Sequence, residues 1–292
     1  MRLAYVDGRM VLLAAASVPV EDRGLQFADS VYEVCAALNG RLLDWPLHLD
    51  RLTRNLATLG IAPPISPAAL TLVARRLLVA NRAAEALLYI QITRGVAKRD
   101  HGFNAEMRPT LMMTVQRFDF VQRVAQQVAG VAIVSMLDQR WGRCDLKTTG
   151  LLANVLAKQA ARGARAFEAL LVDDEGIVAE GSSTNVWAML GGTLVTPPLS
   201  PRVLPGVMRA TLLRLAAAEG VGVTERNFNL DDAIAADELM LSSTTVPVLP
   251  VVQLDGNVIA DGKPGPIAAH LARLIWNEIA VQTGYRPAGL PA

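Results

Sequence analysis

The sequence contains little cysteine and little histidine for a chain of 292 residues. Its only cysteines, Cys35 and Cys144, are far apart and show no metal-ligand spacing. This shortage excludes a disulfide framework and favours a reducing compartment. Three histidines without an H-x3-H pattern argue against a zinc site, so we expect no metal.

The sequence also lacks an excess of charge and a long apolar run. Its 28 basic and 27 acidic residues give a formal net charge of +1, and no basic stripe stands out. We therefore expect no nucleic-acid or anionic-membrane partner. No uncharged apolar run approaches the ~18 residues that span a bilayer. The first ten residues do not resemble a signal peptide, so we expect a cytoplasmic protein.

Apolar residues, by contrast, make up 52% of the chain, which is enough for a large core. The length favours two domains or one large mixed domain. The pattern changes around 118–124, which predicts an N-terminal α+β domain over 1–119 and a C-terminal α+β domain over 120–292. Strand signals at hairpin spacing predict largely antiparallel sheets with flanking helices. No G-x-G-x-x-G follows a strand, and there is no P-loop.

Turn and cap residues predict the elements of the first domain. Hairpin turns are expected at Asp7-Gly8 and Asn39-Gly40. One helix is expected between Asp44, as its N-cap, and Gly60, and a second is expected after a Ser66 cap. Two buried strands are expected over 86–93 and 109–118, joined by an irregular polar loop.

The second domain is predicted to begin with a strand over 131–137. A polar junction and a helix over 151–162 come next, and then a meander of strands. The remaining elements are a helix ending at Gly220, a strand entering a Ser/Thr turn at 242–245, a hairpin over 250–262 and a final helix over 266–282.

Lys147 stands at the polar junction between the strand and the helix. The simple interpretation is a solvated loop lysine. The alternative is a lysine whose ammonium is desolvated or close to other cations such as Arg143, which lowers its proton affinity. Such a lysine can form a Schiff base with a carbonyl group.

Three further features are candidates for a cofactor site. Glu180 ends an apolar strand beside small donors, so it is either a turn glutamate or a carboxylate that holds a proton on a heterocyclic nitrogen. The helix start at Gly206-Val207 and the turn over 242–245 are both rich in donors. Together with Arg51 they suit a phosphate, although each alone can be an ordinary structural feature.

Arg99 and His101 lie two apart in the polar loop, and Tyr32 lies on a strand. A guanidinium, an imidazole and a phenol can converge on one carboxylate. The simpler interpretation is that Arg99 and His101 are solvated loop residues and that Tyr32 belongs to an amphipathic strand. A lysine, a carboxylate, a phosphate cradle and a carboxylate trap together suggest pyridoxal phosphate, with Lys147 bonded to the aldehyde and Glu180 on the pyridine nitrogen.

The chain resembles the fold-type IV pyridoxal-phosphate enzymes, and among them the bacterial D-amino acid transaminases. The resemblance runs in order through "EDRGLQFADSVYEV", "HLDRL", "KRDHGF", "RWGRCDLK", "EGSSTNV", "LPGVMR" and "DELMLSSTT". It implies a two-domain α+β fold and a homodimer in which the partner subunit completes each site. The cofactor-binding residues that it implies are Arg51, Lys147, Glu180, Leu204, Val207, Met208, Ser243 and Thr244.

The resemblance further implies that Tyr32 and the Arg99-x-His101 pair hold the substrate carboxylate, with the pair coming from the partner subunit. The sequence departs from the family at three places. Ala28 and Ser30 replace glycines, Met208 stands where a threonine hydroxyl usually contacts the phosphate, and Thr148-Thr149 follow the lysine. None of these departures removes a catalytic group.

The expected activity is a ping-pong D-amino acid transaminase that moves an amino group between D-alanine or D-glutamate and pyruvate or 2-oxoglutarate. Lys147 is the expected catalytic residue. Branched-chain and (R)-amine transaminases are alternatives on the same scaffold, as is aminodeoxychorismate lyase. A non-catalytic binding module is a fourth alternative, disfavoured because every cofactor-facing group is present.

Overall fold

The computed structural model describes residues 2–104 and 106–289, which form two compact units. The first comprises 2–119 without 105, Leu146–Gly150 and Val281–Tyr285. The second comprises Phe120–Asp145, Leu151–Ala280 and 286–289. The sequence-based division assigned the whole of 120–292 to the second domain. In the structure two short segments of that range join the first unit, and one of them carries Lys147.

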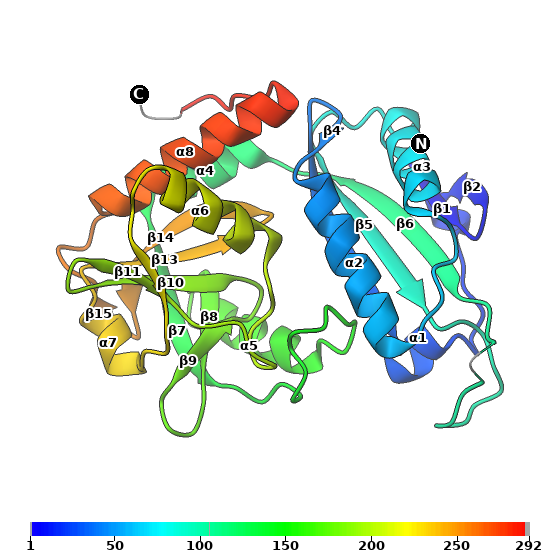
Figure 1. The fold of residues 1–292 in the computed structure, drawn as a ribbon, viewed down its shortest axis with the longest axis horizontal. Coiled ribbons are helices and arrows are strands. Elements are labelled where there is room, and N and C mark those ends of the chain that lie inside the picture. The colour runs from blue at the N-terminus through cyan, green and yellow to red at the C-terminus, as the bar shows by residue number, and fades with distance from the viewer. Residues whose placement is uncertain (1, 105, 290–292) are drawn as a thin grey trace. The chain divides into compact units, whose positions relative to one another are not determined.

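The first unit is built on a six-stranded antiparallel sheet in the order β2-β1-β6-β5-β3-β4 (Figure 1). Its strands are β1 (Leu3–Val6), β2 (Arg9–Leu12), β3 (Ser30–Leu38), β4 (Arg41–Leu42), β5 (Ala86–Thr93) and β6 (Thr110–Arg117). Its helices are the 3-10 turn η1 (Leu13–Ala15), α1 (Arg23–Phe27), α2 (Trp45–Leu59) and α3 (Pro67–Ala80).

Local turn chemistry explains the hairpins and helix ends of this unit. Asp7-Gly8 and Asn39-Gly40 all have positive φ, as tight hairpin turns require, and they join β1 to β2 and β3 to β4 as predicted. The Ser66 hydroxyl accepts the N–H of Ala69 and caps α3, also as predicted. Asp44 is the N-cap residue of α2, but its side chain makes no capping bond. It accepts the side-chain amide of Gln282 at 2.8 Å instead.

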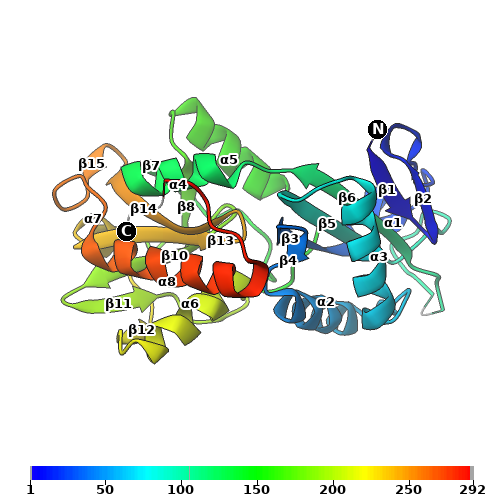
Figure 2. The same ribbon diagram turned by 90° about the horizontal axis from the view of Figure 1, so that it is seen from above.

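One face of this sheet is buried and the other is half-exposed. Strand alternation sends apolar residues of β3, β5 and β6 to one face, where α2 and α3 cover them (Figure 2). The buried set includes Val31, Cys35, Leu88, Ile90, Ile92, Leu111, Met113 and Val115. The opposite face carries Tyr32, Tyr89, Gln91 and Met112, all partly exposed. The half-exposed face is therefore available for a site.

The second unit contains a nine-stranded mixed sheet in the order β12-β11-β10-β13-β14-β7-β8-β9, with β15 paired to β14. Its strands are β7 (Val131–Leu137), β8 (Glu168–Val172), β9 (Val178–Gly181), β10 (Asn185–Leu190), β11 (Thr193–Thr196), β12 (Val223–Glu225), β13 (Glu238–Ser243), β14 (Val246–Leu254) and β15 (Asn257–Val258). Its helices are α4 (Phe120–Ala129), α5 (Leu152–Gly163), α6 (Val207–Ala218), α7 (Leu230–Ile234) and α8 (Pro266–Thr283), whose last three residues join the first unit.

Most pairings in this sheet are antiparallel, but β7 is parallel to both β8 and β14, and β11 is parallel to β12. The helix α5 connects the parallel neighbours β7 and β8, as such a crossover requires. The predicted α+β class is confirmed, with helices and largely antiparallel sheets in both units.

Three α-helices, α1, α4 and α7, and the 3-10 turn η1 were not anticipated from the sequence. The second unit begins with α4 and not with the predicted strand. Phe120, Val124 and Gln127 recur at helical spacing on the buried side of α4. The helix α4 lies beside α8 (Figure 2), where the Trp276 indole N–H donates to the Gln127 amide oxygen at 2.9 Å.

Candidate active site

Lys147 lies beside Tyr32 on the half-exposed face of the first unit's sheet. The Tyr32 N–H donates to the Lys147 carbonyl at 2.9 Å, and Val31 bridges to Thr148. The segment Leu146–Gly150 therefore runs antiparallel to the start of β3. The Lys147 Nζ donates to the Tyr32 hydroxyl at 3.3 Å and lies 4.3 Å from the centroid of its ring. Backbone pairing thus places a half-buried amine next to a phenol.

A chain of hydrogen bonds continues from the lysine segment across the same face. The hydroxyls of Thr149 and Ser30 are hydrogen-bonded, and the Gln91 amide donates to Ser30 at 3.4 Å. The Tyr89 hydroxyl donates to Gln91 at 2.9 Å, and the Tyr89 ring stacks 5.7 Å from that of Tyr32. Burial and the nearby Tyr32 raise the pKa of Tyr89 to about 12. Tyr89 is thus a hydrogen-bond donor at neutral pH.

These contacts give roles to the residues at which the chain departs from the family that it resembles. Ser30 and Thr149, two such departures, bond to each other. Thr148 extends the backbone pairing with β3. Ala28 ends α1 in the left-handed conformation, with a φ of 55°, which a glycine in its place adopts without strain.

Arg51 lies in a buried cluster with Glu33 and His48, between α2 and β3. Its Nε and Nη2 both donate to the Glu33 carboxylate at 2.7 Å, and His48 Nδ1 lies 2.7 Å from the same group. Burial raises the pKa of Glu33, but the charge of Arg51 and the bonds from Arg51 and His48 outweigh it and bring that pKa to about 2. The carboxylate thereby fixes the plane of the Arg51 guanidinium.

Glu180 lies at the end of β9 in the second unit, where three donors converge on it. Arg140 Nη1 donates to one carboxylate oxygen at 2.5 Å. The Asn185 amide and the Leu204 N–H donate to the other, at 3.0 and 3.2 Å. The arrangement therefore gives each oxygen of the Glu180 carboxylate a hydrogen-bond donor and fixes its orientation.

Arg140 is itself held in place by Asp138, which follows β7. Arg140 Nε and Nη2 each donate to Asp138 at 2.9 Å. Burial lowers the pKa of Arg140, but bonding to Asp138 and the charges of Glu180 and Asp138 raise it well above its usual range. Burial likewise raises the pKa of Asp138, and Arg140 outweighs that effect and lowers it. Each charge is thus compensated by a neighbour.

Asn185 connects Glu180 to the two predicted phosphate-binding elements. Its amide also donates to the Leu204 carbonyl at 3.0 Å, and a Cβ on Gly206 would overlap its side-chain oxygen. Gly206 is the N-cap residue of α6, so Val207 and Met208 supply first-turn N–H groups without intrahelical acceptors. Asn185 also pairs with Ser242, directly before the turn that contains Ser243 and Thr244.

Arg99 and His101 lie together in the loop after β5, around the ring of Phe27. The Arg99 guanidinium lies 4.6 Å from the ring centroid, and the His101 ring lies 5.5 Å from it. Both side chains are exposed on this chain. The predicted pair is therefore available at the surface of the first unit.

The structure divides the predicted residues between the units. Tyr32, Arg51, Arg99, His101 and Lys147 belong to the first, and Glu180, Leu204, Val207, Met208, Ser243 and Thr244 belong to the second.

Arg140, Asp138 and Asn185, which position Glu180, were not predicted from the sequence. The sequence does contain an indication of this arrangement, because Asp138 and Arg140 form an Asp-x-Arg sequence directly after a predicted strand. Charged residues that become buried at such a position need a partner of opposite charge. Arg143, expected to act as a cation near Lys147, is 46% exposed and paired with Asp145 at 2.9 Å.

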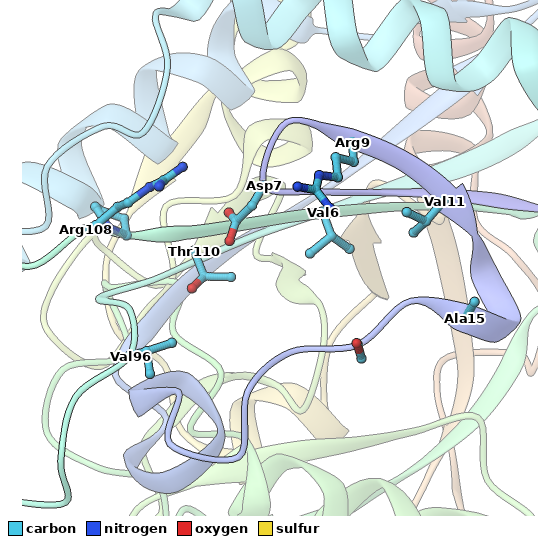
Figure 3. Close-up of a pocket in the computed structure, with 10 residues that line it drawn as sticks. Val6, Asp7, Arg9, Val11, Ala15, Val96, Arg108 and Thr110 are labelled. Atoms are coloured by element: carbon cyan, nitrogen blue, oxygen red, sulfur yellow. The ribbon is translucent and has the colours of Figure 1, made fainter.

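A pocket in the first unit lies beside β1 and the start of β6, and none of the predicted site residues lines it (Figure 3). It is lined by Val6, Asp7, Arg9, Val11, Ala15, Ser17, Val96, Arg108, Pro109 and Thr110. Within 2–104 and 106–289, no cluster of three or more His, Cys, Asp or Glu is arranged for a metal. Nor do these residues include a helix with the length and apolarity needed to cross a membrane.

Comparison with known proteins matches residues 30–254 to the family described as amino-transferase class IV. The D-alanine aminotransferase of Bacillus licheniformis is 36% identical over 277 residues, which cover 95% of this chain and 97% of the relative. That of Staphylococcus aureus strain N315 is 36% identical over 272 residues, covering 93% and 95%.

Solved structures share the fold at lower sequence identity. The branched-chain amino acid aminotransferase of Escherichia coli superposes with a TM-score of 0.87 at 21% identity, covering 99% of this chain and 98% of that one. A PLP-bound hypothetical aminotransferase from Mycobacterium tuberculosis gives 0.80 at 22% identity, covering 97% and 100%. The family match and the full-length relatives lead to one conclusion: the chain belongs to the class IV aminotransferases, with their fold-type IV architecture.

Proposed function

We propose that this aminotransferase acts on D-amino acids with pyridoxal phosphate. It moves the amino group of D-alanine or D-glutamate to a 2-oxo acid such as pyruvate or 2-oxoglutarate in a ping-pong cycle. The observation that carries the proposal is the placement of the Lys147 amine against the Tyr32 hydroxyl. In our proposal this hydroxyl contacts the substrate carboxylate, so that both groups act at one point. Full-length relatives named D-alanine aminotransferase support the choice of substrate.

The residues present fit the proposed cofactor. Lys147 offers a half-buried amine for its aldehyde, and Glu180 offers a carboxylate acceptor for its pyridine N–H. Arg51, the N–H groups of Val207 and Met208, and the turn with Ser243 and Thr244 offer phosphate donors, and Leu204 offers an apolar contact for the ring. When bound, pyridoxal phosphate supplies an electron sink for the carbanion formed at the substrate Cα.

The protein's own groups have four tasks in this proposal. The Lys147 Nζ takes the proton from the Cα of the amino donor in the first half-reaction and delivers a proton to the Cα of the new amino acid in the second. Tyr32 orients that amine through its hydroxyl. Glu180 keeps the proton on the pyridine nitrogen, and Arg140 holds the Glu180 carboxylate in place. Tyr32, Arg99 and His101 bind the substrate carboxylate, the last two reaching the site of a partner subunit in a homodimer.

A half-reaction test separates this activity from its alternatives. Holoenzyme is mixed with D-alanine or L-alanine and the visible absorbance of the bound cofactor is followed. We expect conversion with D-alanine and little with L-alanine, and conversion of L-alanine alone would refute the proposal. L-leucine as the better substrate would identify a branched-chain enzyme. Pyruvate released from aminodeoxychorismate without an added 2-oxo acid would identify a lyase.

An (R)-amine transaminase is separated by the dependence on Arg99. An amine without a carboxylate does not need Arg99 or His101. Under the proposed function, Arg99→Ala raises KM for D-alanine by about tenfold or more, the effect of one lost charge-assisted hydrogen bond. Unchanged KM would remove the assigned role of Arg99.

A further inference from the structure

Arg23, in the short helix α1, is an arginine with only 4% exposure whose contacts all lie in the first unit. Two neighbours fix α1 against the end of β5. The Asp22 carboxylate accepts the Gly24 N–H at 2.8 Å and the Thr93 hydroxyl at 2.9 Å. Gly24 itself lies so close to Thr93 that a Cβ would overlap its methyl group. The "EDRG" sequence thus docks α1 where the loop with Arg99 and His101 begins.

The Arg23 guanidinium hydrogen-bonds to three consecutive carbonyls of that loop. Its Nη1 donates to Asp100 at 2.6 Å and to Gly102 at 3.2 Å, and its Nη2 donates to His101 at 3.2 Å. Its Nε donates to Asp29 at 2.8 Å. A planar group with several fixed donors can impose one backbone path on a polar loop that has no regular structure of its own.

Aromatic rings extend this control to the side chains of the loop. Phe27 has the Arg23 guanidinium 4.8 Å and the Arg99 guanidinium 4.6 Å from its centroid. Phe103 contacts Arg94 at 3.7 Å and Arg23 at 5.5 Å. Arg94 shares Asp29 with Arg23 but donates to the carbonyls of Leu59 and Gly60, outside the loop.

We propose that Arg23 is a positioning residue for the substrate carboxylate site. It holds the loop 99–103 in one conformation, so that the side chains of Arg99 and His101 lie close enough to bind the same carboxylate. The inference rests on the proposed function, in which those two residues bind the substrate carboxylate. Arg23 does not contact the substrate. Because Arg23 orders the loop before the substrate arrives, the loop loses less conformational entropy on binding. The affinity for carboxylates is therefore higher.

The test is Arg23→Lys in the holoenzyme, with propionate as the probe because it carries the carboxylate and methyl group of alanine without the amine. Equilibrium binding of propionate is measured by the change in cofactor absorbance, beside KM and kcat for D-alanine. We expect the Kd of propionate and the KM of D-alanine to rise about tenfold, and kcat to stay within about threefold. A lysine keeps the charge but cannot reach three carbonyls at once.

Arg94→Lys is the matched control, because it breaks a contact to Asp29 and the stacking on Phe103 but no bond to residues 100–102. We expect its Kd for propionate to change less than that of Arg23→Lys. Equal effects of the two substitutions would assign the result to the contacts that both arginines make, with Asp29 and Phe103, and would overturn the role of the carbonyl contacts. An unchanged Kd in Arg23→Lys would overturn the proposal outright.

Two more variants complete the design. If Arg23→Lys fails to fold, Phe27→Leu removes the ring between Arg23 and Arg99, and the same rise in Kd is expected. Arg99→Ala separates the two levels of inference. If it leaves propionate affinity unchanged, the proposed carboxylate role itself fails. If it weakens binding while Arg23→Lys does not, only the positioning role of Arg23 fails.

Discussion

At the scale of single residues, the placement of Lys147 depends on backbone pairing and not on its own side chain. The Lys147 carbonyl accepts the Tyr32 N–H, and this fixes where the amine can reach. The solvated-loop interpretation of this lysine does not describe the structure, since the amine is half-buried against a phenol.

Lys147→Ala tests the catalytic assignment most directly. We expect loss of the visible absorbance of the covalently bound cofactor and a fall in kcat of roughly 10²–10⁴-fold or more, because the variant loses both the base and the covalent anchor. Absorbance spectra and steady-state rates measure the two effects. Lys158→Ala is the control, because Lys158 contacts Phe167 and Glu168 in the second unit. A spectrum of Lys147→Ala that matches the unmodified enzyme would contradict the assignment.

The Ser30–Thr149 hydrogen bond predicts energetic coupling between β3 and the lysine segment. In a double-mutant cycle of Ser30→Ala and Thr149→Val, we expect a coupling energy of about 0.5–1.5 kcal/mol in the free energy of unfolding. Urea denaturation of the four proteins measures it. Strictly additive effects would show that the contact does not stabilise the segment.

At the scale of elements, the packing of α2 on β3 encloses the ion pair of Arg51 and Glu33. The exposures of these residues are 7% and 1%, so each depends on the other for compensation of its buried charge. The pair joins the helix to the strand that carries Tyr32. It therefore connects Arg51, the predicted phosphate-binding arginine, to the strand whose other face carries Tyr32 beside Lys147.

The pKa of Glu33 predicts how this packing responds to acid. Its folded value of about 2 lies below the ordinary value of 4.5. The stabilisation is therefore fully present above about pH 4.5 and is lost as the pH falls toward 2. Its magnitude is on the order of 3 kcal/mol.

Glu33→Gln should therefore lower the unfolding free energy of the apoprotein at pH 7, and this deficit should shrink as the pH falls from 4.5 toward 2. Denaturant unfolding across that range measures the difference. Replacing the exposed Glu106 with Gln is the control and should cause little change at any pH. A deficit that stayed constant with pH would show that the carboxylate charge is not what stabilises the fold.

At the scale of the whole molecule, the residues that our proposal assigns to cofactor and substrate are divided between the two units, and Arg99 and His101 are assigned to a partner subunit's site. The first unit carries Lys147 and Tyr32 and the loop with Arg99 and His101, and the second carries Glu180 and its hydrogen-bond donors. Neither unit alone contains all the predicted groups.

Mixed dimers test the partner's contribution. Lys147→Ala and Arg99→Ala chains are each expected to be impaired alone. If Arg99 acts on the partner's site, a mixed dimer has one site with both native residues. An equal mixture, unfolded and refolded together, should recover about one quarter of native activity at subsaturating D-alanine. No recovery would place Arg99 in the same subunit's site. Each variant refolded alone is the control.

Much of the element pattern was predictable because local chemistry decides it. Asp7-Gly8, Asn39-Gly40, Gly60 and Ser66 each act within a few residues, and each behaves as predicted. The short helix α1 was missed because its stability comes from contacts with β5, which are distant in sequence. Asp44 is the N-cap residue of α2 as predicted, but its side chain bonds to Gln282, which is 238 residues away and which the local sequence does not indicate.

The sequence by itself determined the types of residue available for the chemistry and the family to which the chain belongs. It did so because strand alternation, turns, caps and ordered motifs are all local. Only the tertiary structure decided that Lys147 pairs with β3, that Arg140 and Asn185 hold Glu180, and that Arg23 supports the loop of Arg99 and His101. Hydrogen bonds and buried charges depend on distance in space, and the chain brings their partners together only when it folds.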